Sequence, residues 1–175
     1  MERRTLWRWP FRASVAGPLA VTLVDVQTLA PGAPAPEVPD VDFAQGPTAL
    51  FFFKVTCPVC QMAAPVARKL EEAYPGRVVG VGQDPEPKLA QFDREYGLGI
   101  PTQADVPPYP VSNSYGLSVV PTLVLVAADG TVDQVVESWD REGYNEVSRR
   151  LADLAGAEPV TVSEPGDGLP SFRPG

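Results

Sequence analysis

The sequence predicts an α/β fold in which helices flank a mixed central β-sheet. Three observations carry this prediction. First, an unbroken apolar run at 49–53 is typical of a central strand that is buried on both faces. Second, another apolar run at 77–81 indicates a second core strand. Third, a helical pattern begins at Pro58 between these two runs, and its apolar face consists of Val59, Met62, Ala63, Val66, Leu70 and Ala73.

A second helix is predicted at 85–96, after the second strand. Asp84 is suited to cap the start of this helix, because its side chain can accept a hydrogen bond from a free backbone N–H group. Pro85 fits the first turn, where a proline loses no hydrogen bond, and Gly97 is suited to the end. The expected buried face consists of Leu89, Phe92 and Tyr96.

The remaining elements are a β-hairpin and a last helix. The strands of the hairpin are predicted at 122–126 and 131–136, on either side of the turn sequence Ala-Asp-Gly at 128–130. The last helix opens at Asp140 and ends at Gly156. Its inward residues are expected to be Tyr144, Val147, Leu151 and Leu154.

The length of the chain fits one ordinary domain, which is predicted at 33–156. Its 21 prolines cluster at 31–39, at 101–110 and towards the C-terminus, and such clusters indicate loops or extended segments. An N-terminal extension at 1–32 precedes the domain. A tail rich in proline and glycine follows it at 157–175, and its small number of large apolar residues predicts disorder.

The N-terminal extension has features of a signal peptide or a membrane anchor, since four arginines precede a mildly apolar run at 13–24. Pro18 interrupts this run, Asp25 ends it, and it is too short to span a bilayer. Residues 21–26 also fit an edge strand. This pattern favours a cytoplasmic location, and export or membrane anchoring is the alternative.

Composition excludes several classes of function. The chain has a formal net charge of −8, so we expect neither a nucleic-acid partner nor electrostatic attraction to anionic lipid. It contains no histidine, which excludes Ser-His and Cys-His catalysis and every His-ligated metal centre. Two cysteines alone fill half of a tetrahedral zinc site, so no metal is expected unless two subunits share one ion.

The two cysteines, Cys57 and Cys60, lie where the first strand ends and the first helix begins. They could form a structural disulfide, half of a shared zinc site or a redox couple. A helix start has free N–H groups and a positive dipole end, so it should stabilise a thiolate at Cys57. Cys60, one turn inside the helix, should be shielded. This asymmetry favours a couple in which Cys57 attacks a partner disulfide and Cys60 resolves the mixed disulfide.

Three prolines add to this pattern. Pro58 fits the first helical turn. Pro65 lies in the interior of the same helix, where it removes a hydrogen bond and predicts a bend. Pro121 follows Val120 directly before an apolar strand, where an X–Pro bond can be cis, although an ordinary trans turn is the alternative.

Together these features resemble the thioredoxin superfamily, and within it the TlpA-like and redoxin-type thiol-disulfide oxidoreductases. The resemblance covers roughly 33–156, including the long stretch between the second strand and the hairpin. The residues that carry it are Cys57-Pro58-Val59-Cys60, Pro65, Val119-Val120-Pro121-Thr122 and Ala128-Asp129-Gly130.

The resemblance implies a thioredoxin-like fold and a reaction in which disulfides are exchanged with protein partners. The partners would be proteins that carry a disulfide or a dithiol, and an external thiol would supply electrons. No cofactor is implied besides the Cys57–Cys60 couple. The resemblance also implies that Val120 and Pro121 lie against the cysteines and contact an extended substrate. Thr56 and Pro58 flank Cys57 and complete the expected substrate-binding set.

The chain departs from the pattern of thioredoxins at two positions. Thr56 stands where thioredoxins have tryptophan before the first cysteine, and Phe51 stands where they bury a proton-carrying aspartate. Lys54 is the ionisable residue nearest to the pair in sequence. It could favour a thiolate by its charge, or it could be a solvated lysine at the end of a strand.

Two other functions are alternatives. Peroxiredoxins resemble one another in the motif Pro-x-x-x-Thr-x-x-Cys, but Leu50 and Lys54 stand at its proline and threonine positions here. Residues 83–84, Gln-Asp, are reminiscent of some peroxidase-like redoxins, so a thiol peroxidase stays open. The other alternative is a thioredoxin-fold binding module without catalysis, in which the cysteines form only a local disulfide.

Overall fold

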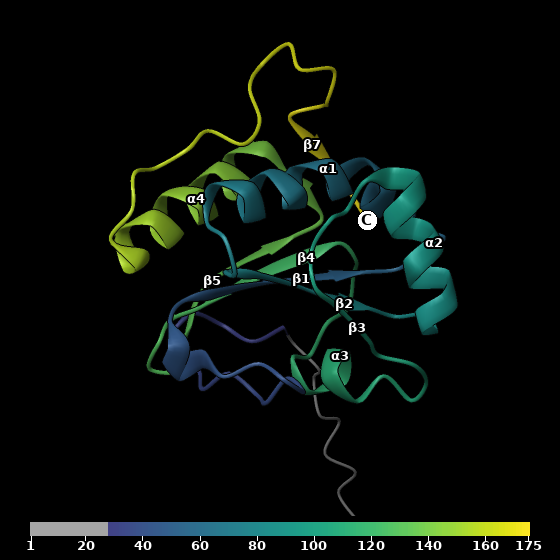
Figure 1. The fold of residues 1–175 in the computed structure, drawn as a ribbon, viewed down its shortest axis with the longest axis horizontal. Helices are drawn as coiled ribbons and strands as arrows, with labels where there is room; N and C mark the ends of the chain where they lie inside the picture. Colours follow the sequence, from purple (N-terminus) through teal and green to yellow (C-terminus); the bar gives the residue numbers. More distant parts are fainter. Residues whose placement is uncertain (1–27) are drawn as a thin grey trace, which may run out of the picture.

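A computed structural model of the protein describes residues 28–175 (Figure 1). The possible signal or anchor and the possible edge strand at 21–26 lie outside the described residues. Across 28–175, every helix falls short of the length and apolar character that a membrane crossing would need.

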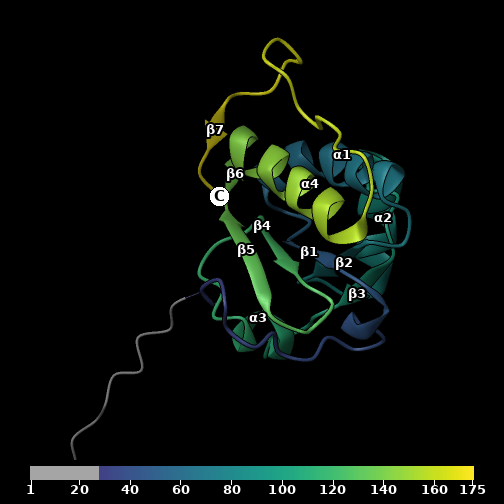
Figure 2. The ribbon, with the colours of Figure 1, turned by 90° about the vertical axis from the view of Figure 1, so that its left-hand side faces the viewer.

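A mixed sheet with the strand order β3-β2-β1-β4-β5 forms the centre of the molecule (Figures 1 and 2). The strands β1, β2 and β3 are parallel to one another, and β4 is antiparallel to both β1 and β5. The α/β fold expected from the sequence is therefore confirmed. The strands are β1 (Thr48–Phe53), β2 (Val78–Gly82), β3 (Thr102–Ala104), β4 (Thr122–Val126) and β5 (Val132–Glu137).

Strand β1 lies in the middle of the sheet, and all six of its residues are buried. Because successive side chains of a strand point to opposite faces, β1 contributes to two separate apolar clusters. Phe51 and Phe53 belong to the cluster beneath α1 (Pro58–Ala73), α2 (Glu86–Tyr96) and α4 (Arg141–Ala155). The other β1 cluster, which contains Leu50 and Phe52, faces α3 and the segment that precedes β1 (Figure 1).

The first helix begins at Pro58, and the last helix begins and ends, where the sequence indicates. Asp140 caps α4 by accepting a hydrogen bond from the N–H group of Glu142, and Gly156 ends this helix in the left-handed region with φ of 66°. Pro65 lies inside α1 on its exposed face, where the missing hydrogen bond adjoins solvent. The expected burial of Leu154 is wrong, because this side chain is 37% exposed near the end of α4.

The predicted cap of α2 is also wrong. Pro85 occupies the cap position without a side-chain hydrogen bond, and the helix starts at Glu86. Asp84 instead turns its carboxylate towards the N–H group of Val55, at a distance of 3.0 Å. The carboxylate of Asp84 is buried, and a buried carboxylate without a hydrogen-bond donor costs free energy. The N–H group of Val55 supplies this donor. The predicted end of the helix at Gly97 is confirmed.

Among residues 28–175, five short elements were not expected from the sequence, and the first of them is the 3-10 helix η1 (Phe43–Gln45). Strand β3 lies within the second proline cluster and adds to the sheet edge by pairing in parallel with β2. Helix α3 (Pro110–Ser114) follows in the same cluster. Strand β6 (Trp139–Asp140) pairs with β7 (Phe172–Arg173) in a separate two-stranded sheet. Elements this short contain too few residues for a periodic apolar pattern, and their pairing comes from tertiary contacts.

The tail at 157–175, expected to be disordered, is laid across α1 and α4 in the structure (Figure 2). Val162 and Ser163 are 1% exposed, and the indole N–H group of Trp139 donates to the carbonyl of Pro170 at 2.7 Å. The tail is thus held mainly by polar contacts, which a count of large apolar residues does not detect. The division of the chain at 32/33 and 156/157 stays a prediction.

The aromatic stack below α1 and α2 should dominate stability. Phe53 is completely buried between Phe51 and Phe92, with ring centroids 5.4 and 4.9 Å away. We expect Phe53→Ala to lower the free energy of unfolding by about 3–5 kcal/mol, because it removes buried apolar surface and leaves a cavity. Phe172→Ala is the control, since its ring is 57% exposed and its loss should cost less than about 0.5 kcal/mol. Urea unfolding of both variants measures the difference, and equal losses would contradict this account of the core.

Candidate active site

Cys57 is the cap residue of α1, and its sulfur takes the place of the oxygen that usually caps a helix. Its backbone is extended, with φ of −86° and ψ of 114°, and the N–H group of Cys60 donates to its Sγ atom at 3.2 Å. Pro58 occupies the first turn, where its missing N–H group costs nothing. The end of β1 and the start of α1 therefore place both cysteines within one helical turn.

The two thiols lie in different environments. Cys57 is half-buried, whereas Cys60 is completely buried, and both are free thiols in the structure. Burial raises the pKa of the Cys60 thiol, and its hydrogen bond with Cys57 raises that pKa further. Cys60 is therefore a protonated, shielded thiol, and Cys57 is the sulfur that an external partner can reach.

Val120 and Pro121 lie beside Cys57. The thiol of Cys57 donates to the carbonyl oxygen of Val120 at 3.5 Å, and the bond between Val120 and Pro121 is cis. Strand pairing explains this contact, because Phe52 of β1 faces Thr122 of β4 and the adjoining loops meet at the same edge. Pro121 is buried, whereas Val120 is partly exposed and can offer its main chain to a partner.

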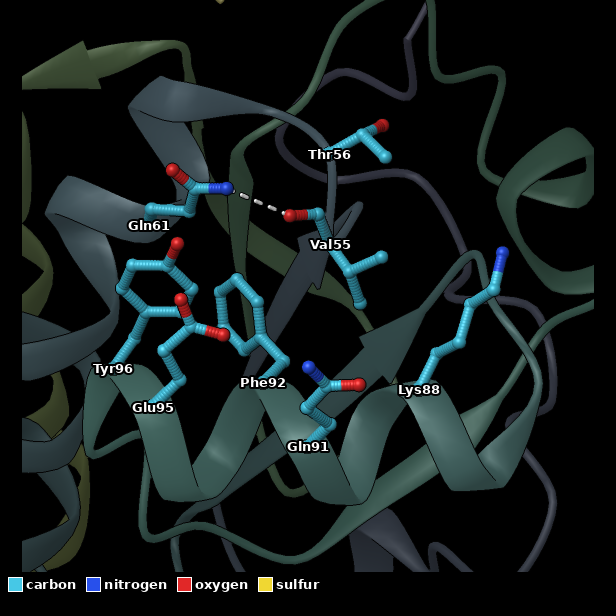
Figure 3. Close-up of a pocket in the computed structure, with 8 residues that line it drawn as sticks. All are labelled: Val55, Thr56, Gln61, Lys88, Gln91, Phe92, Glu95 and Tyr96. Atoms are coloured by element: carbon cyan, nitrogen blue, oxygen red, sulfur yellow. Dashed lines mark hydrogen bonds between the residues drawn. The ribbon is translucent and has the colours of Figure 1, made fainter.

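Thr56 and Pro58 are exposed on either side of Cys57, so all four residues expected to bind substrate surround the reachable sulfur. Thr56 also lines a pocket of about 310 Å³ between α1 and α2 (Figure 3). On the side of this pocket that faces α2, the amide of Gln61 donates to the carbonyl of Val55 at 2.9 Å. The lining residues are Val55, Thr56, Gln61, Lys88, Gln91, Phe92, Glu95 and Tyr96.

Asp84 is a site residue whose position the sequence did not indicate. It is 6% exposed, and its bond to the N–H group of Val55 fixes the loop just before Cys57. Lys88 lies 4.0 Å from the same carboxylate, but its side chain is 62% exposed and so contributes little. No local signal identifies this role, because the bonded partners are 29 positions apart.

The side chain of Lys54 contacts Tyr109. Its ammonium group lies over the ring of Tyr109, 5.9 Å from the ring centroid, which is a cation–π distance. Leu50, at the proline position of the peroxiredoxin motif, is completely buried, and it lies on the face of β1 opposite to Phe51 and Phe53. Leu50 has no polar group that could bind a peroxide, and the polar group of Lys54 lies over Tyr109.

The surroundings of Cys60 are apolar and uncharged. Phe51 is fully buried in the cluster that also contains Cys60. Tyr144 belongs to the same cluster, and among the described residues its buried hydroxyl has no hydrogen-bond partner. Burial raises the pKa of this hydroxyl, and the proximity of Cys60 and Cys57 raises it further. The sequence indicated Tyr144 only as a core residue, because periodicity reports burial and not the neighbours of a polar atom.

Comparison with solved structures reports the same fold. A Chlorobium tepidum protein described as the thiol:disulfide interchange protein DsbE is 18% identical, with a TM-score of 0.64 over 73% of this chain and 99% of that chain. A secreted Mycobacterium tuberculosis disulfide oxidoreductase, homologous to Escherichia coli DsbE, is 26% identical, with a TM-score of 0.52 over 62% and 82%. M. tuberculosis DsbF is 31% identical, with a TM-score of 0.52 over 62% and 80%.

Sequence comparison identifies the family. No curated protein matches the chain. The model of the AhpC/TSA family matches residues 35–135, which is more than half of the chain and includes both cysteines and the Val120-Pro121 loop. The chain therefore belongs to the AhpC/TSA family and has the thioredoxin-like fold of the redoxins.

Proposed function

We propose that this protein is a thiol-disulfide oxidoreductase that exchanges disulfides with partner proteins through Cys57 and Cys60. One observation carries the proposal: a reachable thiol caps a helix, and a buried thiol lies one turn further along the same helix. The two M. tuberculosis relatives support it, since one is described as a disulfide oxidoreductase and the other was observed in oxidised and reduced forms.

In the first step, the Cys57 thiolate attacks one sulfur of a partner disulfide. A new bond forms between Cys57 and that sulfur, the partner's S–S bond breaks, and the released partner thiolate takes up a proton. The N–H group of Cys60, 3.2 Å from the Cys57 sulfur, is positioned to stabilise negative charge on the attacking atom.

In the second step, the sulfur of Cys60 attacks the Cys57 sulfur of the mixed disulfide. The bond between Cys57 and the partner breaks, and the proton of Cys60 leaves with the second partner thiol. Two electrons have then passed from the protein to the partner, and an external thiol returns the protein to its reduced form. The couple of Cys57 and Cys60 needs no other cofactor for this cycle.

Four residues are proposed to hold the partner. The carbonyl of Val120 would pair with an extended segment of the partner, and Pro121 would fix the orientation of that carbonyl. Thr56 and Pro58, exposed on either side of Cys57, would contact the residues that flank the partner disulfide.

The first prediction concerns the type of reaction. With dithiothreitol as electron donor, the protein should reduce the interchain disulfides of insulin, and it should consume hydrogen peroxide slowly because Leu50 and Lys54 cannot position a peroxide. Insulin precipitation and peroxide consumption measure the two rates. Cys57→Ser is the control and should abolish insulin reduction. Fast peroxide turnover without insulin reduction would reverse the choice in favour of a thiol peroxidase.

The second prediction separates the two thiols. Limiting iodoacetamide at mildly acidic pH should label Cys57 at least about tenfold faster than Cys60, because Cys60 is buried and its raised pKa keeps it protonated. Peptide mass spectrometry measures the labelling. In addition, Cys60→Ser should accumulate a mixed disulfide with a partner, whereas Cys57→Ser should trap none. If the disulfide were only structural, the two reduced thiols should be labelled equally. Equal labelling would therefore refute the roles of Cys57 as the attacking thiol and Cys60 as the resolving thiol.

The third prediction concerns the compartment. We propose a cytoplasmic location, which the interrupted N-terminal apolar run favours, and the secreted M. tuberculosis relative supports the alternative of export. Fractionation of cells that produce the full chain, with mass measurement of its N-terminus, tests this proposal. The cytoplasmic fraction should contain the chain starting at Met1 or at the next residue. A processed N-terminus near 30–35 in an exported fraction would contradict it.

A further inference from the structure

Residues 171–175, called here the covering segment, lie along the short strand β6 and end beside the active-site loop. Within this segment β7 pairs with β6, with Arg173 opposite Trp139 and Phe172 opposite Asp140. The N–H group of Arg141 donates to the carbonyl of Ser171 at 2.9 Å. Figures 1 and 2 show the covering segment in yellow, descending from above the helices to the edge of the sheet.

The end of the covering segment touches the same carbonyl oxygen that the Cys57 thiol contacts. The N–H group of Gly175 donates to the hydroxyl of Ser138 at 3.1 Å. A Cβ atom on Gly175 would lie only 2.1 Å from the carbonyl oxygen of Val120 and 2.7 Å from the side chain of Val119. The main chain therefore approaches this oxygen so closely that a side chain at 175 has no room.

Contacts of Arg141 with residues 163–169 of the tail, called here the polar clamp, hold the chain just before the covering segment. The guanidinium group of Arg141 is buried against the tail. It contacts the hydroxyl of Ser163, the carboxylate of Asp167 and the carbonyl of Leu169. The hydroxyl of Ser163 and backbone N–H groups lower the pKa of Asp167 to about 2, with a smaller contribution from Arg141. Asp167 therefore stays charged through the mildly acidic and neutral range, and a change of pH in this range does not release the clamp.

We propose that Val120, Ser138 and the edge of β6 that pairs with β7 form one binding surface for an extended peptide segment of the partner protein, and that the covering segment occupies this surface until a partner displaces it. The inference rests on the proposed function, because it assigns the Val120 carbonyl to substrate binding. It goes beyond that function by extending the surface to β6 and by making the tail a competitor for it.

The contacts of the covering segment indicate the chemistry of the partner. They use the main chain, through the pairing of β6 with β7 and the bonds to Arg141 and Ser138, whereas Phe172 is 57% exposed and Arg173 is also exposed. Binding of this kind pairs an extended segment with β6 through main-chain hydrogen bonds, so affinity comes from the backbone and depends little on side chains. The surface therefore fits extended segments of varied sequence.

Two full-length variants and one deletion test the inference. Gly175→Val should force the covering segment away from Val120, and Ser138→Ala should remove the hydroxyl that holds Gly175. The third variant lacks residues 171–175. Ser138→Ala should speed alkylation of Cys57 by iodoacetamide by about fivefold, the change expected when one net hydrogen bond is lost, and the other two variants should speed it at least as much. Thr161→Val is the matched control, since Thr161 is exposed on the same tail outside the covering segment, and it should leave the rate unchanged.

A peptide with the sequence of residues 167–175 provides a second readout. Added to the deletion variant, it should slow alkylation of Cys57 again, and thermal unfolding verifies that each variant is folded. Unchanged alkylation in all three variants would overturn the inference even if every protein reduces insulin equally well. Conversely, faster alkylation without insulin reduction by any protein would uphold the covering segment and refute the proposed oxidoreductase.

Discussion

The antiparallel pairing of β1 with β4 is the constraint on which the site depends. In this register Phe52 faces Thr122, so the loop that leaves β1 and the loop that enters β4 meet at one edge of the sheet. Cys57 comes from the first loop and Val120 from the second, and the contact of thiol with carbonyl follows. Both faces of β1 are buried, so a slip of one residue would exchange the side chains of the two apolar clusters. The core therefore specifies the register, and the register aligns the site.

The environment around the two sulfurs explains how a single helical turn produces two kinds of thiol. Cys57 lies at the free N–H groups of α1 and is open to solvent on one side, whereas Cys60 points into the core. The core beneath Cys60 is formed by neutral groups, including Phe51 and the hydroxyl of Tyr144. A buried carboxylate at position 51 would have accepted a proton there. In the proposed cycle the proton of Cys60 instead leaves with the partner's sulfur, so the resolving step is linked to product release.

The covering segment and its clamp lie beyond the part of the chain that the family model matches, which ends at residue 135. The matched part contains the sulfurs and Val120, and the adjoining part contains Ser138, Arg141 and the tail. The two parts meet where the N–H group of Ser138 donates to the carbonyl of Pro121 at 2.7 Å. The proposed reaction centre is thus joined, through a backbone hydrogen bond, to a part of the chain outside the family match.

The sequence by itself determined the central strand, the three long helices, the hairpin and the position of the cysteine pair at a helix start. These features rest on local chemistry, since apolar periodicity sets burial and residues such as Pro58 and Gly156 set helix ends. Only the tertiary structure decided that Asp84 bonds to Val55 instead of capping α2, and that the tail is held against α4 and β6. The physical reason is that these contacts join polar groups far apart in the chain. Local patterns record how buried a residue is, but the partner of a buried polar group depends on which segments the fold brings together.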